Sequence, residues 1–288
     1  MNKTAVLIFA FCREKSLKSL LESIKSNDGF EKFSYYFFID GPRSEQDKNK
    51  IAKVTKVIED FSVPKKVIQK LKNNKGLASS IISGVEHVSK FFDKFIVLED
   101  DLIIENNFFD FMENALATFE KNDNIINVSG FSNLPLPSNT AQNFYLLKRS
   151  TSWGWASWSK KWRKIDLNNY ENVSLLDYIN LFFVSPDLPF MLRNQKLGKI
   201  NSWAIRLVLC QVQKNLFSIT PILSFVSNQG DDEFATNVDY IYQRKKSSPK
   251  KITSFKKSYF PQFFLNTYKW LFELYLYLRR SVLRIMAK

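Results

Sequence analysis

The stretch FIVLEDDLI, Phe95 to Ile103, is an apolar run of strand length that ends in three consecutive carboxylates and then turns apolar again. A short continuous run of this kind predicts a buried strand with the acids at its end. Adjacent anions repel one another, and a divalent cation or donor hydrogen bonds would offset that repulsion. Carboxylate oxygens suit Mg²⁺ or Mn²⁺, whose remaining coordination phosphates and water can fill. The alternative is a solvated acidic turn, because short acidic motifs are frequent by chance.

Upstream of this stretch, apolar runs of strand length alternate with helical patterns. Strands are expected at 5–11, 33–39 and 66–71, and helices at 16–25, 50–61 and 77–92. This order predicts an α/β fold with a doubly wound sheet, whose ligand crevice lies beyond the carboxyl ends of the strands. The candidate nucleotide-binding residues at those ends are Arg13, Asp40, Asn74, Glu99, Asp100 and Asp101.

Tryptophans gather downstream of an expected helix at 108–119 and an expected strand at 125–130. The segment TSWGWASW, residues 151–158, holds Trp153, Gly154 and Trp155, and Trp162 follows it. Tryptophan faces stack on sugar rings, and a glycine lets the backbone approach a ligand closely. The segment is therefore a candidate acceptor-binding site. Aromatic core packing is the alternative, because tryptophan is mostly buried.

Two further features lie between residues 201 and 233. A helix expected at 201–213 carries Trp203 and Arg206, which join the candidate acceptor site. A strand expected at 217–226 is broken at Pro221 and leads into a loop that contains Asp231 and Asp232. The loop holds a second acidic group, and its glycine would allow it to close over a ligand. A solvated acidic loop is the alternative.

Positive charge is concentrated at the end of the chain. The net charge is +14, yet residues 244–288 hold 12 Lys and Arg against one acid, which leaves 30 bases and 27 acids in the preceding 243 residues. A helix expected at 266–286 places Lys269, Glu273 and Arg280 on one face and apolar residues on the other. Such a helix suits an anionic membrane interface, and a helix docked on the domain is the alternative.

The composition favours an ordinary globular protein. Hydrophobic residues make up 45% of the 288 residues, and the two cysteines, Cys12 and Cys210, are too few and too far apart for a disulfide framework. Neither a secretion signal nor an apolar run of membrane-spanning length is apparent. We therefore expect a cytoplasmic protein, peripheral on the inner face of the cytoplasmic membrane.

Taken together, three segments resemble a known family. Residues 98–102 (LEDDL), preceded by 74–78 (NKGLA) and followed by 153–158 (WGWASW), are similar to bacterial surface-polysaccharide glycosyltransferases of GT-A fold. These in turn resemble the N-acetylglucosaminyltransferase I type, in which a Glu-Asp-Asp motif forms the metal and nucleotide-sugar site. The resemblance covers residues 6–237. It implies a mixed GT-A sheet and an inverting, metal-dependent hexosyl- or N-acetylhexosaminyltransferase that uses a nucleoside diphosphate sugar, with a UDP-sugar expected.

The resemblance also implies roles for single residues. Asp101 would be the direct ligand of Mn²⁺ or Mg²⁺, while Glu99 and Asp100 would serve the base, the ribose or the donor sugar. Arg13 and Asp40 match positions that contact the nucleotide, with Asp40 reading the base edge. The implied acceptor is a lipid-linked glycan, a lipopolysaccharide or another surface polysaccharide.

The catalytic base has to be sought elsewhere in the chain. Inverting transfer needs a base for the acceptor hydroxyl and a positive charge for the leaving diphosphate. Ala204 and Ile205 stand where the eukaryotic relative has acids, and Asn237 stands where bacterial relatives often have a histidine. Asp232 is the first candidate for the base, followed by Asp231.

The expected organisation has three parts: a donor-binding half at 1–130, an acceptor-binding half of the same domain at 131–243, and a basic linker with an amphipathic membrane-associating helix at 244–288. Two other functions stay open. One is a nucleic-acid or anionic-lipid binding module driven by the basic tail, although no nucleic-acid partner is expected. The other is a sugar nucleotidyltransferase, which normally has a glycine-rich loop where this chain has FCREK at 11–15.

Overall fold

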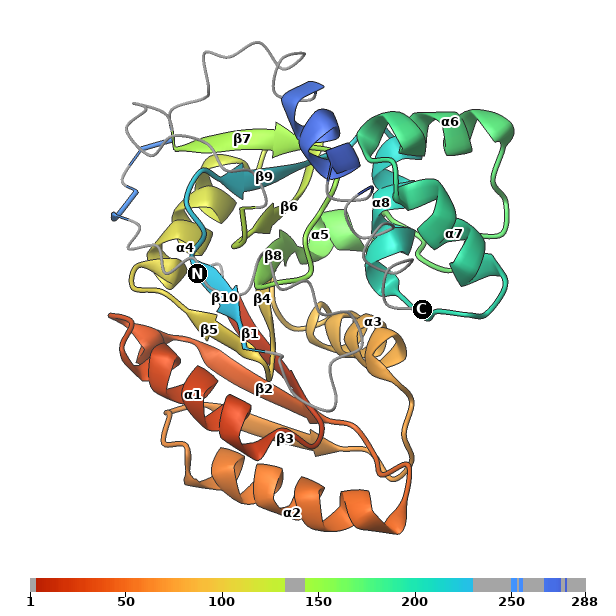
Figure 1. Cartoon of the computed structure of the whole chain (residues 1–288). Coiled ribbons are helices and arrows are strands. Elements are labelled where there is room, and N and C mark those ends of the chain that lie inside the picture. The colour runs from red at the N-terminus through yellow and green to blue at the C-terminus, as the bar shows by residue number, and fades with distance from the viewer. Residues whose placement is uncertain are drawn as a thin grey trace.

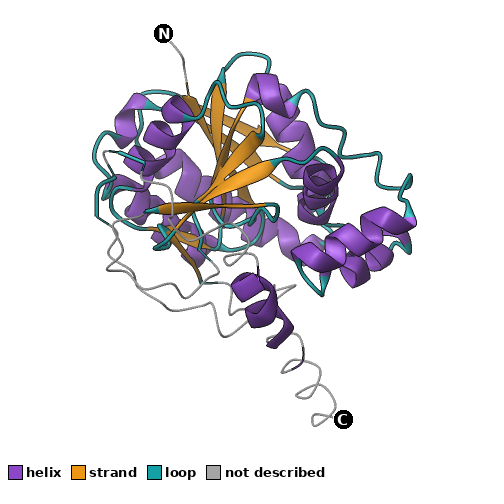
Figure 2. Cartoon of the chain, turned by 90° about the horizontal axis from the view of Figure 1, so that it is seen from above, coloured by secondary structure: helices purple, strands orange, loops and turns teal. Residues whose placement is uncertain are grey.

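An eight-stranded mixed sheet runs through the centre of the molecule, with helices on both sides of it (Figures 1 and 2). The structure is a computed structural model, and it describes residues 4–132, 143–229, 250–252, 254–255, 267–275 and 278. The strand order is β3-β2-β1-β4-β8-β6-β9-β7. The strands are β1 (Thr4–Ala10), β2 (Ser34–Ile39), β3 (Lys66–Lys70), β4 (Lys94–Glu99), β6 (Ile125–Ser129), β7 (Phe144–Leu147), β8 (Trp155–Trp158) and β9 (Phe217–Pro221).

The sheet confirms the predicted fold class, an α/β protein with a mixed sheet. Pairs β1–β2, β2–β3, β1–β4 and β6–β9 are parallel, whereas β8 runs antiparallel to both β4 and β6, and β7 runs antiparallel to β9. Strand β8 therefore lies between β4 and β6, which both precede it in the chain. The expected boundary at residue 130 does not divide the sheet, because strands from both sides of that boundary alternate across it.

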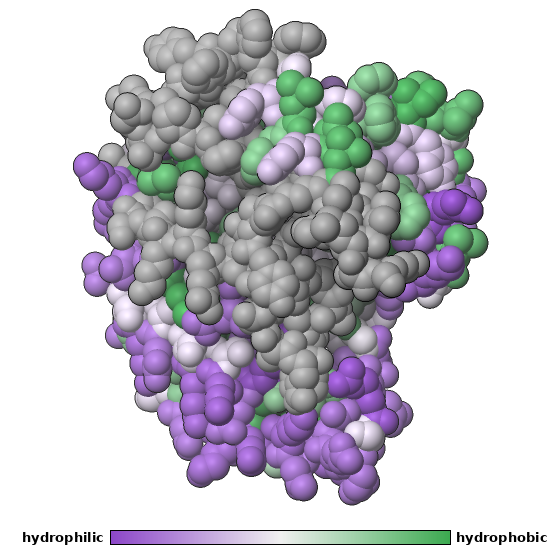
Figure 3. Space-filling view, in the orientation of Figure 1, coloured by the Kyte–Doolittle hydropathy of each residue, from purple (hydrophilic) through white to green (hydrophobic). Residues whose placement is uncertain are grey.

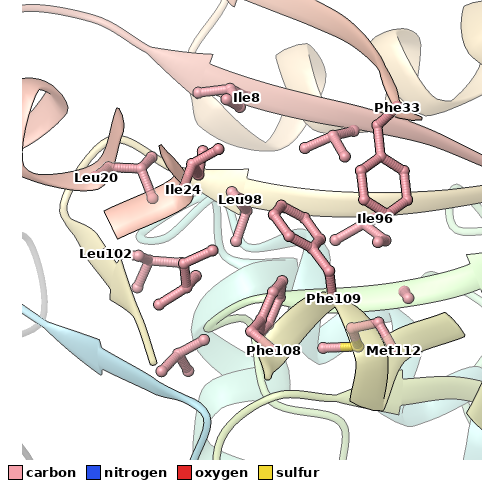
Figure 4. Close-up of a cluster of buried hydrophobic side chains, with 14 of the residues drawn as sticks. Ile8, Leu20, Ile24, Phe33, Ile96, Leu98, Leu102, Phe108, Phe109 and Met112 are labelled. Atoms are coloured by element: carbon pink, nitrogen blue, oxygen red, sulfur yellow. The ribbon is translucent and has the colours of Figure 1, made fainter. Parts of the chain in front are cut away.

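Strand β1 is buried along its whole length because helices cover both faces of the sheet here. On one face, alternate β1 residues meet α1 (Glu14–Lys25), α2 (Glu45–Asp60) and α4 (Phe108–Thr118). Figure 4 shows part of this core, where Phe108, Phe109 and Met112 of α4 point toward Leu98 and Ile96 of β4.

The opposite face packs against α3 (Leu77–Val88), α5 (Ser159–Trp162) and α8 (Trp203–Gln213). Three tryptophans form the centre of this layer. The ring centroid of Trp155 lies 5.1 Å from that of Trp162 and 4.8 Å from that of Trp203, with both pairs stacked. Phe95 of β4 meets Trp155 and Trp162 edge-on.

Two helices begin earlier than the sequence patterns indicated. Helix α1 begins at Glu14, with Arg13 at the N-cap, two residues before the start expected at residue 16. Helix α2 begins at Glu45 and not near residue 50. Its first turn is fixed by Asp47, whose carboxylate accepts the backbone N–H groups of Arg43 and Ser44. Such capping satisfies donors that the first turn leaves without a helical partner.

A second sheet of two strands joins distant parts of the chain. Strand β5 (Leu102–Ile104), directly after the acidic motif, pairs antiparallel with β10 (Val226–Asn228). The Cα partners are Asn228 and Leu102 at one end and Val226 and Ile104 at the other. The apolar residues after the acids, Leu102 and Ile104, are buried by this pairing and by the packing of α1.

A third layer lies outside α8. Helices α6 (Leu175–Val184) and α7 (Leu188–Lys196) were not expected from the sequence, and they pack on the outer side of α8 through a separate apolar cluster. Residues 267–275 form a further helix beside α6 (Figure 1). None of the helices within the described ranges is long and apolar enough to cross a membrane.

A buried ionic cluster holds the 267–275 helix against this layer. Arg149 contacts Asp187 at 2.7 Å and Glu273 at 3.3 Å, and the ammonium of Lys269 donates to Glu273 and to the carbonyl of Val184. Burial alone would raise the pKa of Asp187, but the Arg149 guanidinium and a hydroxyl donor hold it well below its usual value. Lys269 and Glu273 therefore do not form a solvent-facing charged face, which corrects the expected orientation of the C-terminal amphipathic helix.

Candidate functional site

The three acids lie at the carboxyl end of β4, the strand at which the parallel block β3-β2-β1-β4 meets the antiparallel strand β8. Glu99 is the last residue of β4 and pairs in register with Phe9 of β1. The backbone N–H of Asp100 donates to the Phe9 carbonyl, and the Asp100 carboxylate accepts the N–H of Phe11 at 2.9 Å. The neighbouring strand end thus fixes the position of Asp100. The predicted strand with acids at its end is confirmed.

Arg13 places a positive charge beside two of these acids. Its guanidinium lies 3.3 Å from an Asp100 oxygen and 3.1 Å from an Asp101 oxygen, and 16% of its side chain is exposed. It follows β1 directly and caps α1, so the β1–α1 turn places it beside β4. The structure therefore brings together four of the predicted donor-site residues, Arg13 and the three acids.

Among the described residues, the Arg13 guanidinium contacts two of these three carboxylates. Burial, and secondarily the charge of Asp101, raise the pKa of Asp100 to about 6, although Arg13 acts in the opposite direction. Burial and the charges of Asp101 and Asp100 raise the pKa of Glu99 well above its usual value. The strand end therefore favours an added positive charge or a proton.

The residues at this strand end fit a divalent cation only in part. Oε1 of Glu99 is buried and has no hydrogen-bond partner among the described residues, as expected where a cation or donor belongs. Within the described ranges, however, no three His, Cys, Asp or Glu side chains are grouped so that they could hold a metal ion. This arrangement suits an ion held by one carboxylate and otherwise by ligand oxygens and water, as is common for Mg²⁺.

Asp40 was expected to read the base edge of a nucleotide, and the structure gives it a different role. Its carboxylate accepts three backbone N–H groups, from Gly41, Lys75 and Gly76 at 2.8–2.9 Å. The amide of Asn74 donates to the Gly41 carbonyl. Asp40 and Asn74, two of the predicted nucleotide-binding residues, thus join the end of β2 to the turn before α3. This geometry does not support base recognition by Asp40.

Three residues expected at the acceptor site are core residues. Trp155 is fully buried and Trp203 is 3% exposed, because α3, α5 and α8 cover this face of the sheet. Gly154 has a φ of +57°, and a Cβ placed there would lie 2.7 Å from Val226 and 3.5 Å from Leu98. The glycine therefore accommodates β10 and not a ligand. The interpretation of Trp155, Trp203 and Gly154 as acceptor-binding residues is corrected.

Trp153 and Arg206, the other two predicted acceptor residues, are only partly buried. Trp153 packs edge-on against Phe131, with 4.5 Å between the ring centroids, and its neighbour Gly154 lies against Leu98 of β4. Trp153 therefore directly precedes Gly154, which lies beside Leu98 in the strand that ends in the three acids. Arg206 instead donates to Asn201 and lies over the ring of Tyr170, so these contacts do not join it to the acids.

The sequence patterns missed the connection between the acids and the later acidic loop. The backbone N–H of Gln229, directly after β10, donates to the carbonyl of Asp101 at 2.7 Å. Two three-residue strands, more than 120 positions apart, make this connection, and strands that short carry no distinctive sequence signal. Asp231 and Asp232, the candidate bases, lie outside the described residues.

A cavity of about 380 Å³ lies elsewhere, between α1 and α2. Its walls are formed largely by the charged ends of surface side chains, among them Lys18, Lys53 and Asp60. None of the three acids lines it. We therefore place the candidate site at the strand end, where buried charge is concentrated, and not in this cavity.

No family model matches the chain, and a search of curated proteins also finds no match. Among solved structures, the chain aligns with a mannosyltransferase from Pyrobaculum calidifontis in complex with GDP-Man and Mn²⁺. The TM-score is 0.43 at 10% sequence identity, over 73% of this chain and 69% of that chain. At this distance the likeness carries no argument about function, which has to come from the site itself.

Proposed function

We propose that this chain is a glycosyltransferase that moves a sugar from a nucleoside diphosphate sugar, with a UDP-sugar as the expected donor and a divalent cation as cofactor. The observation that carries the proposal is the buried set of three carboxylates at the end of β4, two of which contact Arg13, while Oε1 of Glu99 has no hydrogen-bond partner among the described residues. The carboxyl edge of parallel strands is where α/β sheets bind their ligands. A buried surplus of carboxylates there favours a metal–diphosphate complex.

In this proposal Asp101 is the direct ligand of Mn²⁺ or Mg²⁺. The bound ion would stabilise the charge on the departing diphosphate. Arg13, which contacts Asp100 and Asp101, would keep the acids in position and stay close to the diphosphate. With the cation bound, which favours their ionised forms, Glu99 and Asp100 would accept hydrogen bonds from the ribose or the donor sugar.

The catalytic base in this proposal is Asp232, with Asp231 as second candidate. The support is chain connectivity: Gln229 donates to the Asp101 carbonyl, and Asp232 follows it by three residues. At 3.8 Å between successive Cα atoms, the Cα of Asp232 lies within about 11 Å of that of Gln229. A carboxylate on this loop could therefore reach an acceptor hydroxyl next to the donor, as inverting transfer requires.

For the acceptor, we propose one lining residue and a broad class of glycan. We propose that Trp153 lines the acceptor site. Its side chain is half-buried, and the next residue, Gly154, lies beside Leu98 of β4. A lipid-linked or surface-polysaccharide glycan fits the inverting hexosyl- or N-acetylhexosaminyltransferase that the sequence resemblance implied. Arg206 stays a weaker candidate, because its contacts are with Asn201 and Tyr170.

Nucleotide binding should depend on the metal. With Mn²⁺ present, at least one of UDP and GDP at about a hundred times its Kd should raise Tm by about 5 °C or more, because a ligand of the folded state stabilises it by mass action. Neither nucleotide should do so in EDTA. Differential scanning fluorimetry measures both arms, and AMP with Mn²⁺ is the control for unspecific effects. A well-folded sample that shows no metal-dependent shift with UDP or GDP would exclude the donor site.

Asp232→Asn should separate catalysis from binding. Loss of a general base lowers transfer by about a hundredfold to ten-thousandfold, while an isosteric amide leaves the donor site unchanged. The measurement is release of nucleoside diphosphate from the donor sugar, beside the thermal shift with nucleotide and Mn²⁺. Asp231→Asn, one residue away with the same change of charge, tests the second candidate for the base in the same assays. Full activity in the Asp232→Asn protein would remove Asp232 as the base.

A further inference from the structure

Helix α6 exposes an apolar face to solvent. Five large side chains on it are 41–77% exposed: Leu175, Leu176, Ile179, Phe182 and Phe183. The inner side of the same helix is also apolar and packs with α7 and α8 through Leu181. Apart from Asp177 and Asn180, the residues of α6 are apolar or aromatic, and an exposed apolar patch of this kind marks an interaction surface.

The 267–275 helix extends this surface. The indole N–H of Trp270 donates to the Phe182 carbonyl, and the two rings meet edge-on at 5.6 Å. On the outward side, Tyr268, Leu271, Tyr275 and Leu278 are 44–58% exposed. Figure 3 shows the apolar side chains of α6 and of this helix gathered on one part of the molecule. We call the exposed apolar residues of α6 and of 268–278 the apolar surface.

The orientation of this helix is fixed from its inner side. Lys269 is 2% exposed and Glu273 is 9% exposed, and both belong to the cluster with Arg149. Buried ion pairs of this kind hold a helix in one rotation, because turning it would leave charges without partners. The helix therefore turns Tyr268, Leu271 and Tyr275 outward, while Phe272 packs on a buried cluster of the domain.

Charges around the apolar surface indicate which occupant fits. The acids on α6, α7 and 267–275 all have internal contacts: Asp177 with Ser174, Asp187 with Arg149, and Glu273 with Lys269. The exposed charged side chains on these elements are bases, Arg193 and Lys196. Beyond Leu278 the sequence adds four bases, Arg279, Arg280, Arg284 and Lys288, and no acid.

We propose that the apolar surface is a membrane-docking face that inserts its leucine, phenylalanine and tyrosine side chains into the interface of a bilayer containing anionic lipid. Interfacial helices combine an apolar face with bases that contact acidic head groups. A second copy of this chain would fit less well, because its net charge of +14 and its own surrounding bases would bring like charges together. The proposal does not depend on the reaction that the chain catalyses.

The test is flotation of the full chain with vesicles of phosphatidylcholine alone and of equal parts phosphatidylcholine and phosphatidylglycerol. The full chain should float with the anionic vesicles. Phe183→Asp and Leu271→Asp should each weaken this binding by about tenfold or more, since each removes a large apolar side chain from the interface. Phe91→Asp is the matched control: Phe91 is 65% exposed and Phe183 is 68% exposed, but Phe91 follows α3 on another part of the molecule.

The substituted residues are exposed, so each variant should keep the Tm of the unchanged chain, and binding can be compared among folded proteins. Failure of the unchanged chain to float with anionic vesicles would overturn the proposal. Binding that both surface variants retain would also overturn it, because the basic tail would then be sufficient. Light scattering provides the third outcome: a dimer that Phe183→Asp dissociates would identify a second copy as the occupant instead of a membrane. None of these results depends on nucleotide binding or transfer.

Discussion

Asp101→Asn is expected to lower sugar transfer by about a thousandfold or more and to abolish the Mn²⁺ dependence of nucleotide binding. Under the proposed function, Asp101 is a direct ligand of the ion, and loss of metal assistance removes several kcal/mol of stabilisation from the transition state. An amide oxygen is a weaker ligand than a carboxylate for a hard cation. Release of nucleoside diphosphate and thermal shifts with and without Mn²⁺ measure the two effects.

The same substitution should not unfold the protein. The charge of Asp101 helps to raise the pKa of Asp100, so removing it relieves repulsion within a buried set of acids. Arg13 keeps Asp100 as a partner. We therefore expect an unchanged or higher Tm without ligand. Asp60→Asn, at a carboxylate that is 68% exposed, is the matched control and should change neither activity nor stability. Transfer at the original rate in the Asp101→Asn protein would show that Asp101 is not the ligand.

Trp155→Ala is expected to lower the free energy of unfolding by about 3–5 kcal/mol, the usual range for deleting a buried aromatic side chain. Trp155 is fully buried between β4 and α8 and stacks on both Trp162 and Trp203. The substitution would open a cavity between the sheet and this layer of helices. Urea unfolding followed by circular dichroism measures the change.

Trp153→Ala is the control for that prediction. Trp153 is two positions away, only partly buried, and contacts Phe131 at the edge of the core. The Trp153→Ala protein should lose much less stability than the Trp155→Ala protein. Under the proposed function, Trp153→Ala should lower transfer to the acceptor more than it lowers nucleotide binding. If Trp155→Ala were as stable as the unchanged chain but inactive, Trp155 would belong to the site and not to the core.

The order of strands and helices before residue 100 could be predicted from sequence because local patterns determine it. The run from Phe95 to Leu98 is apolar at every position, as is typical of a strand that is covered on both faces. The acids follow it directly, so their place at the strand end could be predicted as well. Arg13 could be placed beside them because the parallel order brings the ends of β1 and β4 to the same edge.

The roles of the tryptophans depended on contacts between distant segments. Trp155 and Trp153 have similar surroundings in sequence, yet β8 inserts between β4 and β6, and α8 then covers Trp155. Asp40 resembled a ligand residue because it ends a strand, but the turn before α3 supplies the three N–H groups that occupy its carboxylate. In both cases the partner lies in another element, which a local pattern does not disclose.

Lys269 and Glu273 illustrate the same limit for the C-terminal helix. Their spacing of four residues is typical of a solvent-exposed ion pair, and so the sequence favoured a charged outer face. Arg149, more than 100 residues earlier, makes burial of this pair possible by adding a second positive charge. The amphipathic pattern was correct, but which face turned outward depended on that distant arginine.

The pairing of β10 with β5 sets an order on synthesis of the protein at the ribosome. Strand β4 and its three acids leave the exit tunnel long before Val226–Asn228 is translated. Strand β5, which follows the acids, therefore has no pairing partner until more than 120 further residues are added. A nascent chain released before Gln229 would lack the N–H group that holds the Asp101 carbonyl. Premature termination in that interval would therefore yield chains whose acidic turn lacks this hydrogen bond, while Asp100 would keep its contacts with Phe9, Phe11 and Arg13.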